Sequence, residues 1–371
     1  MINSKKFISI FIKLGVKYFT GVPDSVLNSF IKDLKQEKRI EHNPTMNEGS
    51  AIGLGVGYYL STKKIPLIYM QNSGLCNALN PILSLVDEKV FSIPQIILVG
   101  RRGAPGIKDE PQHAKIGPKT LNLLKSLDLK FFDLNKCNNF KEIEKDIKKS
   151  ISIAKKFNKP VFLIVNKKFF ENKKSEKKPI KKSQLSKRIT YLDCLLKNKK
   201  NKDSIFFSSL GNASREIFHL NTIEKRSHKR FFYTIGAMGH VSQIAVAFKQ
   251  FQKNKEVVII DGDGSIQMQL GNLLKIGKSN LKILHIIFDN SCHESTGGHE
   301  LGISNLNYEK LFRAFGYKYV KTIRSIKIFD KEINKKFNKS KALIIKIQPG
   351  TIPNLPRPNI KANKLKKIFI N

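Results

Sequence analysis

Two apolar runs flank a glycine turn between Glu256 and Asn290. The first run, 257–260, ends at the residues DGDGS, helix-forming residues follow, and the second run, 281–288, is closed by Asp-Asn. This order predicts a strand, a tight turn, a helix and a second strand. Because a helix between two strands is the usual connection of a parallel pair, the stretch favours an α/β fold.

The turn at 262–265 suits a metal-bridged phosphate. The Asp263 carboxylate, at the carboxyl end of a strand, can reach a hard cation, and backbone N–H groups that open the next helix can hold phosphate oxygens. Asn290 follows Asp263 by 27 residues, so the next parallel strand would bring its amide oxygen to the same ion. The alternative is an ordinary Gly-Asp-Gly loop, but the strand context and the spacing together favour the metal site.

This stretch resembles the metal-diphosphate motif of thiamine diphosphate enzymes, which begins Gly-Asp-Gly and ends in an asparagine pair. Asp289 replaces the first asparagine of that pair, whereas Asn290 keeps the ligand position. The resemblance implies that Asp263 and Asn290 bind Mg²⁺ through their side chains and that Cys292 binds it through its main-chain carbonyl. Near the diphosphate it places Gly262, Gly264 and Ser265.

Residues 171–188 interrupt a regular alternation of strands and helices. They read ENKKSEKKPIKKSQLSKR, almost without apolar side chains, as a solvated linker would. The 371 residues suffice for two domains, which we place at 1–170 and 189–371. We expect each to be a doubly wound parallel sheet with helices on both faces. The predicted strands are 16–20, 65–71, 95–100, 129–133 and 161–165, then 205–208, 231–234, 257–260, 283–288 and 342–347.

The net charge of +39 raises the question of a nucleic-acid or membrane-surface partner. However, the lysines are dispersed over nearly every predicted helix, and no basic motif interleaved with aromatic residues occurs. We therefore expect no nucleic-acid partner, and no stretch is long enough to span a membrane. The four cysteines form no C-x-x-C pair, which favours a reduced, cytoplasmic setting.

A second informative stretch, 41–71, contains Glu48 at the start of a predicted helix. Glycines at 53, 55 and 57 allow another backbone or a flat ring to approach closely. An acid at a helix start is often only a favourable charge. By resemblance to thiamine diphosphate enzymes, Glu48 instead bonds the aminopyrimidine ring of the cofactor and promotes its imino tautomer.

Further motifs resemble the phosphonopyruvate decarboxylase branch of these enzymes. The branch has a pyrimidine-binding and a diphosphate-binding domain without a middle domain, and its cofactor lies between domains of different subunits. The resemblance implies a homo-oligomer that decarboxylates 3-phosphonopyruvate, a small anionic 2-oxo acid, in phosphonate biosynthesis. Alternatives are a sulfopyruvate decarboxylase, an acetolactate-type carboligase and a basic binding protein. The motifs are GVPDS at 21–25, QNSG at 71–74, GRRG at 100–103, DEPQH at 109–113, GAMGH at 236–240 and NSCHESTGG at 290–298.

The same resemblance assigns further site residues. Met238 would wedge the cofactor into its bent form and Gly236 would offer a carbonyl to its amine, although a methionine is more often a core residue. Asp24 could be a proton donor or a helix N-cap. The other candidates for proton transfer are His113 and His293.

Recognition of the anionic tail of the substrate calls for fixed cationic donors. Arg101 and Arg102 leave a predicted strand at its carboxyl end, where α/β sheets bind ligands, and Lys108 follows on the same loop. Adjacent residues on an extended segment point in opposite directions. We therefore expect only one of the two arginines to face the substrate, unless both are surface charges.

Overall fold

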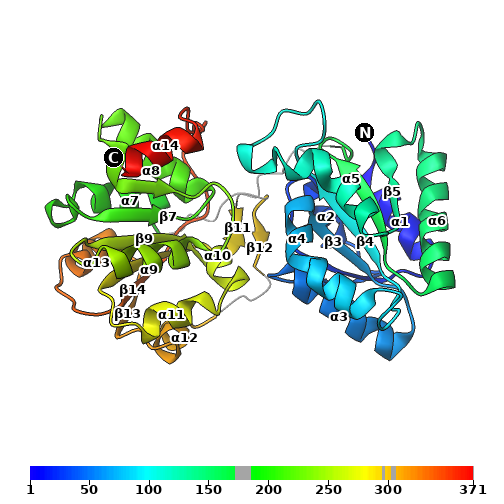
Figure 1. Ribbon diagram of the computed structural model, residues 1–371, viewed down its shortest axis with the longest axis horizontal. Helices are drawn as coiled ribbons and strands as arrows, with labels where there is room; N and C mark the ends of the chain where they lie inside the picture. Colours follow the sequence, from blue (N-terminus) through cyan, green and yellow to red (C-terminus); the bar gives the residue numbers. More distant parts are fainter. Residues whose placement is uncertain (172–184, 295–296, 302–305, 371) are drawn as a thin grey trace. The chain divides into compact units, whose positions relative to one another are not determined.

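The computed structural model describes residues 1–171, 185–294, 297–301 and 306–370. Most of the expected linker, 172–184, and two residues of the motif at 290–298 therefore lie outside the described residues. The chain divides into two compact units, Met1–Glu176 and Lys177–Asn371. Within the described residues, each unit contains a six-stranded sheet whose strands are all parallel (Figure 1).

The first sheet has the strand order β2-β1-β3-β4-β6-β5. Successive residues of a strand face opposite sides, so Ile96 and Leu98 enter one apolar core while Ile97 and Val99 enter the other. Helices α1, α2 and α6 cover the first face, and α3, α4 and α5 cover the second. The strands are β1 (Tyr18–Gly21), β2 (Glu41–Pro44), β3 (Leu67–Gln71), β4 (Ile96–Arg101), β5 (Phe131–Asp133) and β6 (Val161–Asn166), and the helices are α1 (Ser4–Lys13), α2 (Asn28–Leu34), α3 (Glu48–Thr62), α4 (Asn72–Pro81), α5 (Ile116–Ser126) and α6 (Phe140–Phe157).

The second sheet has the order β13-β14-β10-β9-β7-β8. Its β9 and β10 are the two strands predicted around the glycine turn, and they pair in parallel. Helices α7, α8 and α13 pack on one face, and α9, α11 and α12 pack on the other. The strands are β7 (Ile205–Ser208), β8 (Phe231–Tyr233), β9 (Val257–Gly262), β10 (Ile283–Asp289), β13 (Tyr319–Ile323) and β14 (Lys341–Lys346), and the helices are α7 (Arg188–Lys197), α8 (Asn212–Ile223), α9 (Val241–Phe251), α10 (Asp263–Met268), α11 (Asn272–Lys278), α12 (Tyr308–Ala314), α13 (Ile326–Ile333) and α14 (Ala362–Ile370).

Both sheets reverse their strand order at one point, as doubly wound sheets do. In the first unit the reversal lies between β1 and β3, and in the second it lies between β7 and β9. Ligands of such sheets bind outside the carboxyl ends of the strands at this point. The predicted α/β class with two doubly wound parallel sheets is therefore confirmed, and the two positions for a site are defined by topology alone.

Arg188 was placed at the end of the solvated linker, and this interpretation is wrong. It is the first residue of α7 and is only 5% exposed. Its guanidinium is neutralised by Glu216 and Glu294, which lie far along the chain and could not be recognised as partners from the local sequence.

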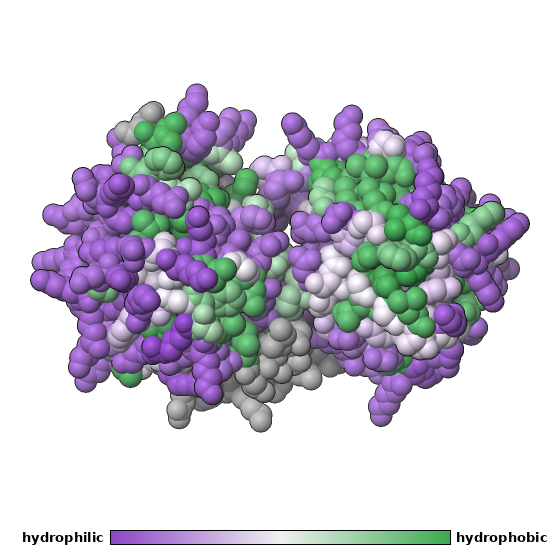
Figure 2. Space-filling view, turned by 60° about the horizontal axis from the view of Figure 1, so that its bottom comes forward, coloured by the Kyte–Doolittle hydropathy of each residue, from purple (hydrophilic) through white to green (hydrophobic). Residues whose placement is uncertain are grey.

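Among the described helices, none is sufficiently long and apolar to cross a membrane. The four cysteines are all free thiols. Hydrophilic side chains cover much of the surface in Figure 2, in keeping with the dispersed lysines.

Candidate active site

The carboxyl ends of β9 and β10 bring Asp263 and Asn290 together. Asp263 is the first residue of α10 and is buried. Its Oδ2 accepts hydrogen bonds from the backbone N–H of Asn290 (3.2 Å) and of Ser291 (2.7 Å), and its Oδ1 accepts one from the N–H of Gly264 (2.9 Å). The spacing of 27 residues thus places both expected metal ligands at one edge of the sheet.

A cavity of about 100 Å³ opens at this edge. It lies beside the reversal point, because its lining combines residues that follow β7 with residues that follow β9 and β10. Every candidate of the second unit except Gly236 is among the lining residues, which include Met238, Gly262, Asp263, Gly264, Ser265, Asn290, Cys292 and His293.

Several of these residues are held by defined contacts. The Oγ of Ser265 accepts a hydrogen bond from the N–H of Gly239 (3.1 Å), which fixes the loop that carries Gly236 and Met238. His293 is buried, and a Cβ added at Gly264 would lie 3.1 Å from its ring. A side chain larger than hydrogen at 264 would therefore crowd the imidazole.

The sequence did not single out three parts of the same cavity. The loop 209–212 follows β7 and contains Gly211, whose φ of 87° favours glycine. Arg188 and Glu294 also line the cavity. The sequence does carry a signal for this loop, because Gly211 lies between a predicted strand and a helix. Nothing in the local sequence marks Arg188 as a cavity residue.

In the first unit, Glu48 opens α3 as predicted and is buried. Its Oε2 accepts a hydrogen bond from the Nδ2 of Asn77 (3.0 Å). A Cβ added at Gly74 would lie 2.1 Å from its Oε1, so the motif at 71–74 makes room for this acid. Burial raises the pKa of the Glu48 carboxyl, and the hydrogen bond from Asn77 opposes this rise.

Asp24 lies beyond the end of β1 and is also buried. Its Oδ1 accepts a hydrogen bond from the side-chain amide of Gln71, and its Oδ2 accepts one from the N–H of Val26 (3.1 Å). Burial raises the pKa of Asp24 to about 6, against the hydrogen bond from Gln71 and the charge of Arg102. Asp24 is not the N-cap of α2, which is Leu27, so the capping alternative is wrong.

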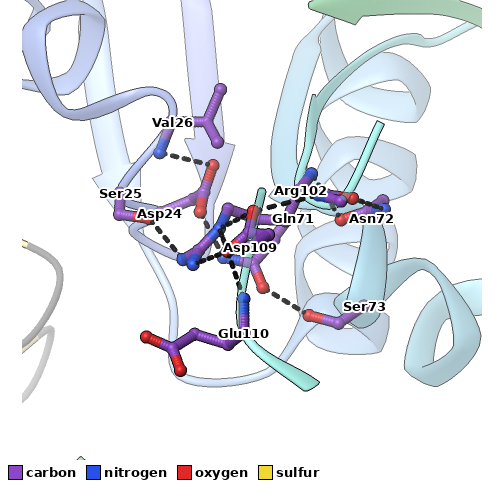
Figure 3. Close-up of polar contacts among 10 residues, drawn as sticks. Asp24, Ser25, Val26, Gln71, Asn72, Ser73, Arg102, Asp109 and Glu110 are labelled. Carbon is purple, nitrogen blue, oxygen red and sulfur yellow. Dashed lines mark hydrogen bonds and ion pairs between the residues drawn. The ribbon is translucent and has the colours of Figure 1, made fainter. Parts of the chain in front are cut away.

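Arg102 lies beside Asp24 at the end of β4, as Figure 3 shows. Its guanidinium forms a bidentate ion pair with Asp109 and donates from Nη1 to the Oγ of Ser25 (3.1 Å). Burial opposes ionisation of Asp109, but the hydrogen bonds from Arg102 prevail and hold the pKa of that carboxyl well below its usual range. The arginine is therefore a fixed cation next to a carboxyl whose pKa burial raises.

Arg101 points elsewhere. It is buried, and its Nε donates to the carbonyl of Gly117 (2.8 Å) while its Nη2 reaches that of Pro118 (3.4 Å). The two arginine side chains thus bond different groups, and Arg101 holds the start of α5. That only one of them faces the substrate stays a prediction. Lys108 is exposed on the loop that also carries Asp109.

His113 is buried at the end of this loop. Its Nδ1 has no hydrogen-bond partner among the described residues. Burial and the charge of Arg102 lower the pKa of its imidazole. Burial thus disfavours the charged form of this imidazole, as it does for the Asp24 carboxyl.

Two family models match the chain, one in each unit. Residues 4–121 match the N-terminal TPP-binding domain of thiamine pyrophosphate enzymes, and residues 209–347 match the C-terminal TPP-binding domain. This chain belongs to the thiamine pyrophosphate enzyme family. The described residues between the two matches belong to the two sheets and their helices, which agrees with the expected lack of a middle domain.

Three curated relatives of this family member are decarboxylases. Phosphonopyruvate decarboxylase of Streptomyces viridochromogenes is 27% identical over 384 residues, covering 100% of this chain and 94% of the relative. The beta subunit of sulfopyruvate decarboxylase of Methanocaldococcus jannaschii is 34% identical, covering 43% of this chain and 81% of the relative. The alpha subunit of that of Methanococcus maripaludis is 33% identical, covering 43% and 92%. The predicted cofactor, thiamine diphosphate, and the predicted carboxy-lyase class are thereby confirmed.

The donors at the second-unit cavity fit the Mg²⁺ that the family implies. Asp263 is buried beside Asp289, and burial together with that neighbouring charge raises its pKa, so a cation would relieve the excess of negative charge. In the described part of the chain, no three His, Cys, Asp or Glu side chains converge as a metal site. One carboxylate, one amide oxygen and one carbonyl leave positions for phosphate oxygens and water, as Mg²⁺ prefers.

Asp289, the departure from the asparagine pair, has its own compensation. In the parallel pair of β10 and β14 it lies opposite Lys346, and the two side chains form an ion pair. Its Oδ1 also accepts from the N–H (3.1 Å) and the Oγ (3.0 Å) of Ser291. The added carboxylate is thus paired beside the site, and Asn290 keeps the amide at the ligand position.

Proposed function

We propose that this protein uses Mg²⁺ and thiamine diphosphate to decarboxylate 3-phosphonopyruvate to phosphonoacetaldehyde and CO₂ in phosphonate biosynthesis. The observation that carries the proposal is the similarity to a phosphonopyruvate decarboxylase over 100% of this chain and 94% of the relative. It is supported by a fixed arginine beside a titrating carboxyl in the first unit and by an oxygen-lined metal position in the second.

In the second unit, Asp263, Asn290 and the carbonyl of Cys292 would hold Mg²⁺. The diphosphate would lie along Gly262, Gly264 and Ser265, while Gly236 and Met238 would hold the ring portion of the cofactor. We accordingly propose residues 189–371 as the diphosphate-binding domain and 1–170 as the pyrimidine-binding domain.

When bound, thiamine diphosphate supplies a sink for the electron pair left by the departing CO₂. Glu48 would exchange a proton with the aminopyrimidine at its Oε1, because Asn77 occupies Oε2. Asp24 would supply the proton that product release needs, and Gln71 keeps its Oδ1 in place. His113 and His293 are the other candidates for this proton transfer.

Arg102 would contact the phosphonate of the substrate. Its pairing with Asp109 and its bond to Ser25 orient the guanidinium before substrate arrives, which lowers the entropy cost of binding. A planar guanidinium matches the oxygens of a phosphonate. Lys108, on the same loop, would add a second cation.

Sulfopyruvate is the alternative substrate. The sulfopyruvate decarboxylase subunits have a higher identity over shorter lengths, and a sulfonate would bind to the same arginine. An acetolactate-type carboligation is a third and less supported activity. Release of CO₂ from phosphonopyruvate, sulfopyruvate and pyruvate under identical conditions separates these functions, with phosphonopyruvate expected to have the highest kcat/KM.

If kcat/KM is higher for sulfopyruvate, then sulfopyruvate replaces phosphonopyruvate as the proposed substrate. Acetolactate formed from pyruvate, in place of free aldehyde, would indicate the carboligase.

We also propose a homo-oligomer with sites between subunits, supported by relatives that are themselves subunits. We further propose a cytoplasmic location, because the four cysteines are free thiols, as is usual in a reducing compartment.

A further inference from the structure

A buried ion-pair network joins the start of α7 to the cavity of the second unit. Arg188 donates to Glu216 from Nε (2.8 Å) and Nη2 (3.2 Å). Its Nη1 donates to the Oε2 of Glu294 (3.0 Å). Arg188 is 5% and Glu216 0% exposed, so the guanidinium is fixed between two carboxylates from different parts of the chain.

The same Oε2 of Glu294 also accepts a hydrogen bond from the Nδ2 of Asn290 (3.1 Å). An amide has a donor end and an acceptor end, so this bond fixes which way the side chain of Asn290 faces. The Oδ1 of Asn290 then accepts the N–H of Cys292 (3.1 Å) and keeps a second lone pair. In the flipped orientation, Oδ1 would meet the Glu294 carboxylate and the amide hydrogens would meet the N–H of Cys292.

We propose that Glu294 is a positioning residue, fixed by Arg188, which holds the Asn290 amide with Oδ1 toward the Mg²⁺ position. The inference deepens the proposed function and rests on it. Partners that orient metal ligands typically change metal affinity by 10–100-fold when removed. Arg188, Asn290 and Glu294 all line the cavity that contains Asp263, so the contact acts at that site.

A direct ligand role for Glu294 predicts different behaviour. Glu294→Gln keeps one oxygen that can accept from both Arg188 and Asn290, while its amide replaces Oε1, which has no hydrogen-bond partner among the described residues. A positioning role therefore predicts that Glu294→Gln is close to wild type. A ligand role predicts that this variant loses Mg²⁺ as Glu294→Ala does.

The test measures the Mg²⁺ concentration that gives half-maximal binding of thiamine diphosphate to metal-stripped protein, by equilibrium dialysis. Glu294→Ala, and Glu294→Asp with its shorter reach, should both raise this concentration by about tenfold or more. Glu294→Asp keeps a negative charge for Arg188, so the test remains possible if Glu294→Ala does not fold. Glu332→Ala is the matched control, because Glu332 is a buried, ion-paired carboxylate of α13.

The control should lower the thermal unfolding temperature and leave the Mg²⁺ dependence unchanged. Wild-type Mg²⁺ dependence in Glu294→Asp, or equal losses in Glu294→Gln and Glu294→Ala, would overturn the positioning role. If the wild-type protein binds thiamine diphosphate with no dependence on Mg²⁺, the proposed function itself fails. The two failures are therefore distinguished by the wild-type titration.

Discussion

Two buried carboxyls of the first unit each face a glycine. A Cβ at Gly74 would lie 2.1 Å from the Oε1 of Glu48, and one at Gly100 would lie 2.2 Å from the Oδ2 of Asp24. Any side chain larger than hydrogen at position 74 or 100 would therefore clash with one of these carboxyls. These close contacts explain why glycine lies at 74, in the first turn of α4, and at 100, near the end of β4.

We expect Glu48→Gln to lose most of the turnover and to retain appreciable cofactor binding, because the acid activates the cofactor and does not anchor it. Gly74→Ala should lower kcat similarly, since its methyl group displaces Oε1. Gly271→Ala is the matched control, because a Cβ there meets no atom within 4 Å. Steady-state kinetics and dialysis check all three variants, and turnover of Glu48→Gln near wild type would contradict the role.

Asp24 predicts a pH dependence of stability. Burial raises its pKa to about 6 in the folded protein, against an ordinary value of 3.8. Between these pH values the folded protein therefore binds more protons than the unfolded chain. The free energy of unfolding therefore falls as pH rises through this window, by up to about 3 kcal/mol. Asp24→Asn removes the titration, so its stability relative to wild type should improve by most of that amount from pH 4 to pH 7.

Urea unfolding at both pH values measures this difference. The exposed Asp128 provides the control, because Asp128→Asn should show no comparable pH-dependent change. A stability difference between Asp24→Asn and wild type that stays constant with pH would contradict the raised pKa.

At the same scale, the sequence predicted that Asp263 and Asn290 lie close together, because both follow strands that are neighbours in the sheet. It did not predict that Arg102 is paired with Asp109, nor that Glu294 bonds Asn290. Such contacts depend on side-chain directions after packing, for which periodicity and spacing give no signal.

At the scale of elements, the apolar runs located ten of the strands to within a few residues. In the two six-stranded sheets they did not reveal β2 (Glu41–Pro44) or β13 (Tyr319–Ile323), each of which is one of the two edge strands of its sheet. Edge strands are partly solvated, and β2 has no fully buried residue. Without a continuous apolar run, these strands form through pairing with a neighbour that only the folded sheet provides.

The two adjacent arginines at the end of β4 are expected to have different roles, Arg102 in substrate binding and Arg101 in stability. Arg102→Ala should reduce kcat/KM for phosphonopyruvate by well over tenfold, because loss of a charged contact costs about 2–5 kcal/mol, and it should barely change any slow pyruvate decarboxylation. Arg101→Ala should instead lower the free energy of unfolding by roughly 2 kcal/mol, through lost bonds to the carbonyls of Gly117 and Pro118.

Kinetics on both substrates and urea unfolding of both variants test this separation. An equal loss on phosphonopyruvate and pyruvate for Arg102→Ala would mean that the anionic tail is recognised elsewhere. Selective loss in Arg101→Ala would contradict its assignment to α5.

At the scale of the whole molecule, the proposed cofactor contacts are divided between two units. Glu48 belongs to the first and Asp263 to the second. The first unit also exposes large apolar side chains, including Leu54 and Leu60 on α3 and Phe91 after α4. These surfaces are compatible with the proposed oligomer, which would complete each site with domains of different subunits.

Subunit mixing tests this arrangement. Glu48→Gln should retain little activity alone, and Asp263→Ala should be inactive and should also lose cofactor binding. A mixed dimer would hold one intact site, so random exchange of a two-fold symmetric dimer should recover about a quarter of wild-type activity. No recovery after exchange, or a fully active monomer in light scattering, would contradict shared sites.

The proposed function is tested most directly by ¹³CO₂ release from carboxyl-labelled phosphonopyruvate, using protein stripped of metal and cofactor. Thiamine diphosphate and Mg²⁺ are added singly and together. We expect release only when both are present, with phosphonoacetaldehyde formed in equal amount. Release without thiamine diphosphate, or no release with both present, would contradict the proposed function.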